Sequence, residues 1–131
     1  MVCAWDIYAI APDGSGRRQL THATSAHSSA NSPVWSPDGT RIAYWKAPAA
    51  FVVTDGDLYV MAADGSGQTQ VAAAADKTEA FPVWAPDGHT LAFATAPRGS
   101  FEFDVALLPL DGGGPVTILD QPREQVPTSW R

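Results

Sequence analysis

The chain has 131 residues, of which 45% are hydrophobic and 17% charged, and this composition fits one folded domain rather than a disordered chain. The formal net charge of -6 argues against a duplex nucleic acid partner, which needs a basic surface, and the pair Arg17 and Arg18 is expected in a solvated turn. Eleven glycines and eleven prolines recur along the chain and argue against a bundle of long helices.

Insertion into a membrane and export by a signal peptide are not expected from these residues. No apolar run approaches the roughly 20 residues of a membrane span, and the first residues lack a basic segment followed by an apolar core. Cys3 is the single cysteine, which excludes an internal disulfide and a cysteine-built metal site. The compartment in which the protein works stays open.

Two sequence motifs recur with a period of roughly 45 to 51 residues. The heptapeptide at residues 33–39 returns at residues 82–88 with six identical residues. The second motif carries two aspartates seven residues apart, and it begins at Asp6, at Asp57 and, in a weaker copy, at Asp104. Such a period is typical of propeller blades and other repeat arrays, so we expect repeated units instead of one irregular domain.

Each repeat is predicted to form four short strands, a to d, joined by tight turns. In the first complete copy these strands are Ser32–Ser36, Arg41–Trp45, Asp57–Ala62 and Gln68–Ala72. Between strands a and b, proline sets the backbone angle of the turn, aspartate bonds locally and glycine takes the left-handed conformation. An Asp-Gly-Ser-Gly turn joins strands c and d. Two tight hairpins per repeat make an antiparallel four-stranded meander.

In chain order, the prediction begins with a half blade and ends with one strand. Residues 5–21 supply strands c and d, residues 32–72 and 81–119 each supply a full blade, and residues 126–131 look like the first strand of a next blade. The predicted fold is an all-β propeller segment of four-stranded antiparallel blades, about 2.75 blades in an incomplete ring. Because open sheet edges are a liability, we expect either a truncated segment of a longer protein or self-association that completes the ring.

The strand faces predict sheets that are buried on both sides. In strand b, Ile42 and Tyr44 lie on one face and Ala43 and Trp45 on the other, and the second copy repeats this pattern. Large residues that meet small ones in this way let stacked sheets interdigitate. The alanine-rich segment 71–80 departs from the pattern because its helix propensity is high. We expect strand d to run there into a loop that has room for one helical turn.

The repeated tryptophans and turns are expected to be structural. Trp35, Trp84 and Trp130 recur at one position of strand a and are predicted to lie in the core rather than to stack on a ligand. The turn aspartates are expected to stabilise their turns, because the alternating oxygen ligands of a calcium loop are missing. The turn residues are Pro37, Asp38, Gly39, Pro86, Asp87 and Gly88.

The Trp-Ser-Pro-Asp-Gly turn is followed by Arg-Ile-Ala-Tyr and then by Asp-Leu-Tyr-Val-Met with Asp-Gly. This pattern covers most of the chain and resembles the TolB-like propeller repeat, also called the WD40-like or PD40 repeat. The last copy departs from it, since Ala85 replaces the serine of the turn, Ala106 replaces the tyrosine of strand c, and residues 112–114 are glycines. The resemblance implies blades similar to those of the periplasmic TolB translocation protein and of prolyl-oligopeptidase and dipeptidyl-peptidase propellers. Family members are often periplasmic or exported and others are cytoplasmic, so the resemblance specifies blades and not a function.

No catalytic residue, metal ligand or cofactor is predicted. The sequence contains no Gly-x-Ser-x-Gly elbow, which the hydrolase domain of the oligopeptidases would carry. His22 and His27 fit no zinc signature, and His89 lies in a turn. The Gly-Ser-Gly tripeptides at residues 14–16 and 65–67 lie in hairpin turns with no helix behind them, which argues against phosphate loops.

Binding is predicted on the rim formed by loops b–c and d–a, which are longer and more varied than the turns of the other rim. Exposed aromatic residues beside charges suit a protein or peptide contact. The alternative is that these aromatic residues pack down on the blade. The candidate residues are Trp45, Lys46, Phe51, Val52, Asp55, Arg98, Phe101 and Glu102.

The predicted function is a non-catalytic, TolB-like protein- or peptide-binding propeller module. One alternative is the substrate-gating propeller of a prolyl-oligopeptidase- or dipeptidyl-peptidase-like serine peptidase, here without its catalytic domain. A second alternative is a metal-dependent lyase-type propeller that uses His22 or His27. A hydrolase domain in the neighbouring reading frame favours the peptidase, and metal retained after dialysis favours the lyase.

Overall fold

The computed structural model describes residues 4–48, 53–112 and 116–119, and these residues form β-strands and one short 3-10 helix, η1 (Ala23–Ala26). No described helix is long and apolar enough to cross a membrane. The strands are β1 (Tyr8–Ala9), β2 (Arg18–Gln19), β3 (Ser29–Trp35), β4 (Arg41–Ala47), β5 (Asp57–Ala62), β6 (Thr69–Ala72), β7 (Lys77–Trp84), β8 (Thr90–Pro97), β9 (Asp104–Pro109) and β10 (Val116–Leu119).

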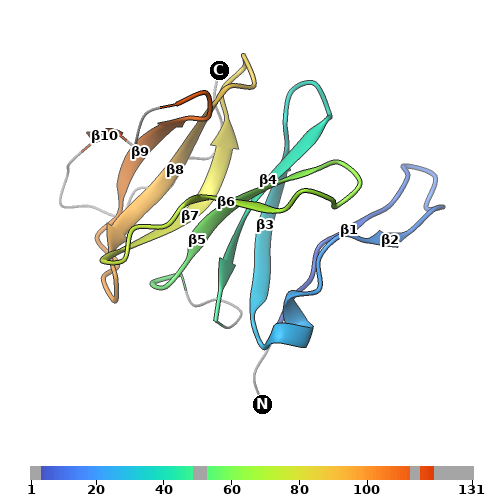
Figure 1. Cartoon of the computed structure of the whole chain (residues 1–131), viewed down its shortest axis with the longest axis horizontal. Helices are drawn as coiled ribbons and strands as arrows, with labels where there is room; N and C mark the ends of the chain where they lie inside the picture. The colour runs from blue at the N-terminus through green and yellow to red at the C-terminus, as the bar shows by residue number, and fades with distance from the viewer. Residues whose placement is uncertain (1–3, 49–52, 113–115, 120–131) are drawn as a thin grey trace.

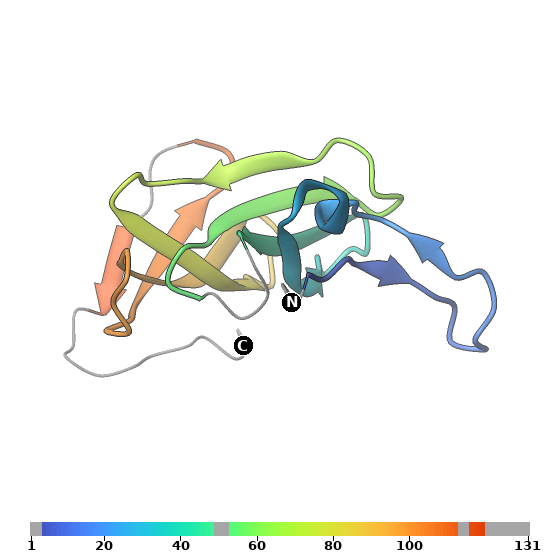
Figure 2. The same cartoon turned by 90° about the horizontal axis from the view of Figure 1, so that it is seen from below.

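These strands form three antiparallel sheets in the described part of the chain. Strands β3 to β6 make a four-stranded meander, the first blade, and β7 to β10 make a second one, the second blade. Strands β1 and β2 form the N-terminal hairpin. The two blades lie side by side (Figure 1), and the hairpin extends from the side of the first blade opposite the second blade (Figure 2). The predicted all-β architecture of four-stranded antiparallel blades is confirmed.

The first strand of each blade begins earlier than predicted. β3 starts at Ser29 and β7 at Lys77, whereas the sequence placed residues 73–80 in a loop with room for a helical turn. Residues 77–80 instead pair with residues 94–97 of β8. Helix propensity is worth only tenths of a kcal/mol per residue, so these ladder hydrogen bonds and the burial of Ala80 override it.

A β-bulge interrupts the first strand, β3 or β7, at the same repeat position in both blades. The register shifts between Asn31 and Val34 and between Ala80 and Val83. Each bulge contains a non-glycine residue with positive φ, Ser32 at 48° and Phe81 at 54°, followed by a proline. Proline has no N–H to donate to the ladder, so a bulge is where a strand tolerates it.

The first blade is buried on both faces, as its alternation of residues predicts. Its strand β4 contributes to three hydrophobic clusters, of which the one formed by Ala43, Trp84 and Leu91 is the smallest. The cluster between the two blades contains Trp45, Leu58, Phe93, Ala106 and Leu108. The cluster between the first blade and the N-terminal hairpin contains Ile7, Leu20, Ile42, Tyr44 and Met61. Full burial of side chains of this size stabilises the fold by roughly 1.5–3 kcal/mol each.

Two tryptophans at one repeat position have opposite exposures. Trp84 is 6% exposed and Trp35 is 53% exposed, so the core prediction is right for Trp84 and wrong for Trp35. Trp84 lies against the first blade and donates from Nε1 to the Val34 carbonyl at 3.1 Å. On the N-terminal side of Trp35, the described residues form only the hairpin of β1 and β2, which correspond to strands c and d of a blade. The strands a and b that would cover the Trp35 ring are not among the described residues. Trp130 and the predicted strand at residues 126–131 lie outside the described residues.

Candidate binding site on the loop rim

Three connecting loops meet on one rim of the two blades. They follow β4 (described from residue 53), β6 (residues 73–76) and β8 (residues 98–103). The backbone N–H of Arg98 donates to the Asp76 carbonyl at 3.0 Å, and that of Gly99 donates to the Thr54 carbonyl at 3.1 Å. The b–c and d–a loops therefore come together, as the sequence-based topology requires.

The Arg98 side chain joins these loops. Its Nη2 donates to Asp57 Oδ1 at 2.8 Å, its Nη1 donates to Asp55 Oδ1, and its Nε donates to the Ala75 carbonyl at 3.2 Å. Burial raises the pKa of the Asp57 carboxyl, and the Arg98 guanidinium opposes this rise because it favours the charged carboxylate. The planar guanidinium, which follows β8 of the second blade, thus bonds to two further segments, residues 55–57 of the first blade and the loop between β6 and β7, in an arrangement that one lysine ammonium cannot reproduce.

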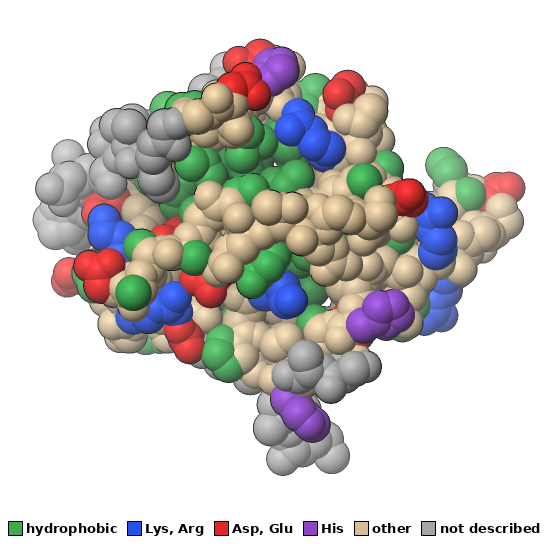
Figure 3. All heavy atoms as spheres, viewed as in Figure 1, with side chains coloured by type: hydrophobic (Ala, Val, Ile, Leu, Met, Phe, Trp, Pro, Cys, Tyr) green, Lys and Arg blue, Asp and Glu red, His purple; other side chains and the backbone are tan. Residues whose placement is uncertain are grey.

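A pocket of about 350 Å³ opens beside this arginine. The Lys46 ammonium lies 4.9 Å from the centre of the Tyr59 ring in a cation–π contact. The lining residues are Ser28, Lys46, Ala47, Pro48, Asp55, Asp57, Tyr59 and Arg98. The pocket therefore combines two cations, two carboxylates and one aromatic ring. Positive and negative side chains are also interspersed over the face shown in Figure 3.

The pocket gathers three of the predicted binding residues, Lys46, Asp55 and Arg98. Phe101 and Glu102 are exposed but do not line it. The prediction that Trp45 contacts a ligand from an exposed loop is wrong, because its side chain is 2% exposed and packs in the cluster between the blades. This indole lies 5.7 Å from the Phe81 ring, so here the alternative of packing on the blade holds. Phe51 and Val52 lie outside the described residues.

Known structures share this arrangement of blades. A putative TolB from Agrobacterium tumefaciens is similar over 86% of this chain and 40% of its own, with a TM-score of 0.70 and 24% sequence identity. TolB from Acinetobacter baumannii is similar over 84% of this chain and 25% of its own, with a TM-score of 0.65 and 17% identity. The chain has a TolB-like β-propeller fold. It spans less than half the length of either TolB chain.

The other comparisons add little to this TolB-like assignment. No protein-family model matches the sequence, and no curated protein matches it. The AtxE2 isopeptidase is similar over 75% of this chain and 18% of its own, with a TM-score of 0.54 and 21% identity. At such identities the similarity shows the fold alone, so the function has to be argued from the site.

Sequence reasoning did not assign Asp57 and Tyr59 to the candidate site on the loop rim. The signal was present, because Asp57 opens strand c at the same repeat position as Asp6. The Asp6 carboxylate accepts hydrogen bonds from Thr21 Oγ1 at 2.8 Å and from the Ala23 N–H at 2.6 Å, and it also accepts one from Thr24 Oγ1. Burial alone would raise the pKa of Asp6, but these hydrogen bonds outweigh it and lower the pKa. The repeated aspartate therefore ties a rim loop to strand c.

The turn residues of the TolB-like blades act within their turns. Asp38 Oδ1 accepts hydrogen bonds from Ser36 Oγ at 2.7 Å and from the Thr40 N–H at 3.0 Å, and these bonds lower its pKa to about 2. Asp87 accepts from the His89 N–H at 2.9 Å. In the described residues no group of three histidines, cysteines or carboxylates is placed to hold a metal ion.

Proposed function

We propose that this chain is a non-catalytic module that binds a protein or peptide through the loop rim around Lys46 and Arg98. The observation that supports this function is the pocket itself, in which strands β4 and β5 and the loops that carry Asp55 and Arg98 bring together two cations, two carboxylates and a tyrosine. Binding sites concentrate on loops that a rigid scaffold holds in place. The similarity to TolB structures is consistent with such a module, because it places these loops on a propeller scaffold.

The polar groups of the pocket suit a peptide that carries an acidic side chain. Arg98 is already engaged by Asp55 and Asp57, so its charge is largely neutralised. Lys46 holds its ammonium over the Tyr59 ring, where a ligand carboxylate can pair with it. The Asp55 side chain is 45% exposed and can accept hydrogen bonds from the backbone N–H groups of an extended peptide.

A substrate-gating propeller is the second candidate, and the isopeptidase similarity favours it. In that case the rim would admit peptides towards a catalytic domain supplied by another segment. A gating role predicts weak binding of many peptides with little dependence on Lys46. A binding role predicts a small set of peptides that need this lysine.

Peptide selection on the purified chain tests the proposal. Displayed random peptides are selected on the wild-type chain, and the enriched peptides are titrated against Lys46→Glu. We expect at least about tenfold weaker binding by this variant. The attraction between the Lys46 ammonium and a carboxylate of the peptide is replaced by a repulsion between two carboxylates. Lys77→Glu is the matched control. This substitution makes the same charge change at an exposed residue that does not line the pocket. Equal binding by the wild type and Lys46→Glu, or no enriched peptide, would overturn the proposal.

A further inference from the structure

Two described loops join the last strand of one sheet to the first strand of the next, and different carboxylates hold them. In the loop between β2 and β3, the Asp6 carboxylate accepts hydrogen bonds from Thr21 Oγ1, from the Ala23 N–H and from Thr24 Oγ1. One side chain thus satisfies three donors of this loop. The loop between β6 and β7, residues 73–76, is the equivalent segment of the next repeat.

The second loop keeps the aspartate but not the hydroxyl groups. Asp57 opens β5 at the same repeat position, and alanines at residues 72 and 75 replace the two threonines. Asp57 bonds to Arg98 instead, with 2.8 Å between its Oδ1 and Nη2 of the arginine. The equivalent backbone donor, the N–H of Ala74, donates to Oε1 of Glu79 at 3.3 Å. Glu79 therefore replaces the aspartate as the acceptor for this loop.

Glu79 reaches the loop from inside the protein. It is 3% exposed, and its Oε2 atom is buried without a hydrogen-bond partner in the described part of the chain. A buried carboxylate that has lost most of its hydrogen bonds to water is unfavourable, so burial favours the neutral acid. Burial accordingly raises the pKa of Glu79 to about 7, although the bond from the Ala74 N–H lowers it. The group that holds the loop therefore changes its charge near neutral pH.

The titratable and charged residues of the elements around Glu79 are mostly acidic. They are Asp55 and Asp57 before and in β5, Asp76 and Lys77 before and in β7, Arg98 after β8, and Asp104 in β9, which pairs with Thr95 in the strand beside Glu79. Asp57 and Asp76 raise the pKa of Glu79, and Lys77 lowers it. Arg98 is already bonded to two aspartates. An ionised Glu79 thus meets more negative than positive charge.

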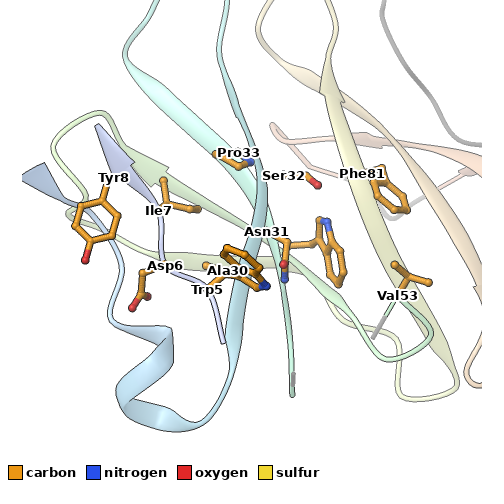
Figure 4. Close-up of a pocket in the computed structure, with 11 residues that line it drawn as sticks. Trp5, Asp6, Ile7, Tyr8, Ala30, Asn31, Ser32, Pro33, Val53 and Phe81 are labelled. Atoms are coloured by element: carbon orange, nitrogen blue, oxygen red, sulfur yellow. The ribbon is translucent and has the colours of Figure 1, made fainter. Parts of the chain in front are cut away.

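On the side of the first blade, β7 is firmly joined to residues 53–56. Thr78 Oγ1 accepts from the Gly56 N–H and donates to the Val53 carbonyl, both at 2.8 Å, and the Glu79 N–H donates to the Gly56 carbonyl at 2.8 Å. Val53 and Phe81 also line one pocket, shown in Figure 4. These contacts do not involve the Glu79 carboxyl, so we expect this side to keep its structure when the carboxyl ionises.

The loop of residues 73–76 is the side that can yield. Its residues 73, 75 and 76 are exposed. Besides the bond to Glu79, it is held by Arg98, whose N–H donates to the Asp76 carbonyl at 3.0 Å and whose Nε donates to the Ala75 carbonyl at 3.2 Å. Exposed loops with few anchoring bonds open locally at low cost.

We infer that Glu79 is a pH-sensitive switch for the loop of residues 73–76 and, through Arg98, for the rim pocket. The neutral carboxyl accepts from the Ala74 N–H and keeps the loop closed. The ionised carboxyl favours an open loop, because the open loop lets water reach Oε2. Opening removes the carbonyls of residues 75 and 76 from Arg98, whose guanidinium can then turn toward a ligand carboxylate.

The direction of the switch follows from the linkage between protonation and loop closure. Each pH unit between the 4.5 of an ordinary glutamate and about 7 shifts the equilibrium toward the open loop by up to about tenfold. Closure is thus complete at acidic pH and weakest above about pH 7. The consequence for ligand binding rests on the proposed function, whereas the loop equilibrium does not, so the test needs no ligand.

Nuclear magnetic resonance of the ¹³C- and ¹⁵N-labelled chain between pH 5 and pH 8 tests the inference. The Cδ signal of Glu79 reports ionisation, and hydrogen exchange at the N–H groups of Ala74 and Arg98 reports the loop. After correction for the intrinsic pH dependence of exchange, we expect protection at both groups to fall at least about tenfold, with the midpoint of the Cδ titration. The Gly56 N–H, on the joined side, should lose less protection.

Three variants make the result specific. Glu79→Gln keeps an acceptor but cannot ionise, so protection at Ala74 should stay high at both pH values. Glu102→Gln, the same change at an exposed glutamate of the rim, is the matched control and should behave as the wild type. Asp76→Asn removes a neighbouring carboxylate at an exposed position and should move the midpoint to lower pH.

Two results would overturn the inference. One is equal protection of the Ala74 N–H at pH 5 and pH 8 in the wild type while the Cδ signal of Glu79 titrates. The other is the same pH dependence of this protection in Glu79→Gln as in the wild type. Neither result bears on peptide binding, and a failed peptide selection would leave the loop switch untouched.

Discussion

The guanidinium of Arg41 in the first blade lies 4.7 Å from the centre of the Trp84 ring in the second blade. This contact lies at the edge of the interface between the two blades. There, Arg41 Nη2 also donates to the carbonyl of Gly88, in the turn between β7 and β8. The ring is thus covered by a cation, by β3 and by the apolar cluster of Ala43 and Leu91. Its repeat counterpart Trp35 is 53% exposed, and this contrast allows the contribution of the interface to stability to be measured.

Trp84→Ala and Trp35→Ala form a matched pair of stability measurements. We expect Trp84→Ala to lower the free energy of unfolding by about 3–5 kcal/mol, since it leaves a cavity and an unpaired Val34 carbonyl. Trp35→Ala removes a half-exposed ring and should cost less than about 1 kcal/mol. Urea denaturation followed by circular dichroism gives both values. Equal costs would show that the interface does not bury Trp84 as described.

Glu79 predicts how stability depends on pH. Its side chain is buried in β7, and this burial, with a smaller contribution from Asp57, raises its pKa to about 7 against the 4.5 of an ordinary glutamate, although the Ala74 N–H donates to Oε1. Between these pH values the folded state keeps a proton that the unfolded state has lost. The free energy of unfolding therefore falls as pH rises from about 4.5 to about 7, by at most about 3 kcal/mol at about 1.4 kcal/mol per pKa unit.

The variant Glu79→Gln isolates this contribution. It cannot ionise, so we expect it to match the wild type near pH 4.5 and to be more stable than the wild type at pH 8. Urea titrations at four or five pH values check the difference between the two curves. A wild-type curve parallel to that of Glu79→Gln would show that Glu79 titrates normally.

Gly56 is required by close packing rather than by its backbone angles. A Cβ atom there would lie 2.8 Å from Cε3 of Trp45 and 2.9 Å from the Glu79 carbonyl oxygen. Gly56→Ala should therefore destabilise the fold by about 1–3 kcal/mol, as overpacking does. The smaller ring in Trp45→Phe should relieve the clash with Trp45, so the double variant should lose less than the sum of the two single changes. Thermal unfolding of the four chains measures this coupling, and strict additivity would contradict the clash.

Arg98 is expected to hold the rim loops together more than it adds to overall stability. Its pairs with Asp55 and Asp57 are partly exposed, so a double-mutant cycle with Asp57→Asn should give a coupling of only about 1 kcal/mol. Arg98→Ala should nevertheless speed hydrogen exchange at the Gly99 N–H, which donates to the Thr54 carbonyl across the loops. Arg17→Ala, in the distant hairpin, is the control. Unchanged exchange at Gly99 in Arg98→Ala would contradict the role of the arginine as a link between loops.

The sequence predicted the fold because the information for its strands and turns is local. The Pro-Asp-Gly turns set their own backbone angles, and Asp38 bonds to residues only two positions away. The repeat of about 50 residues predicted the blades, and the large and small residues of strand b predicted two buried faces. Part of the candidate site was also predictable, since loop position alone identified Lys46, Asp55 and Arg98.

Tertiary structure decided what depends on a neighbouring sheet. Trp35 and Trp84 share one local sequence, but among the described residues a four-stranded blade covers Trp84 and not Trp35. Trp45 ends the predicted strand b and is nevertheless buried, because β4 continues to Ala47 and the second blade packs over it. Residues 77–80 form a strand against their helix propensity because β8 pairs with them. Turn geometry arises from residues close in sequence, whereas burial and strand pairing arise from residues about 15 to 50 positions away, which no local pattern specifies.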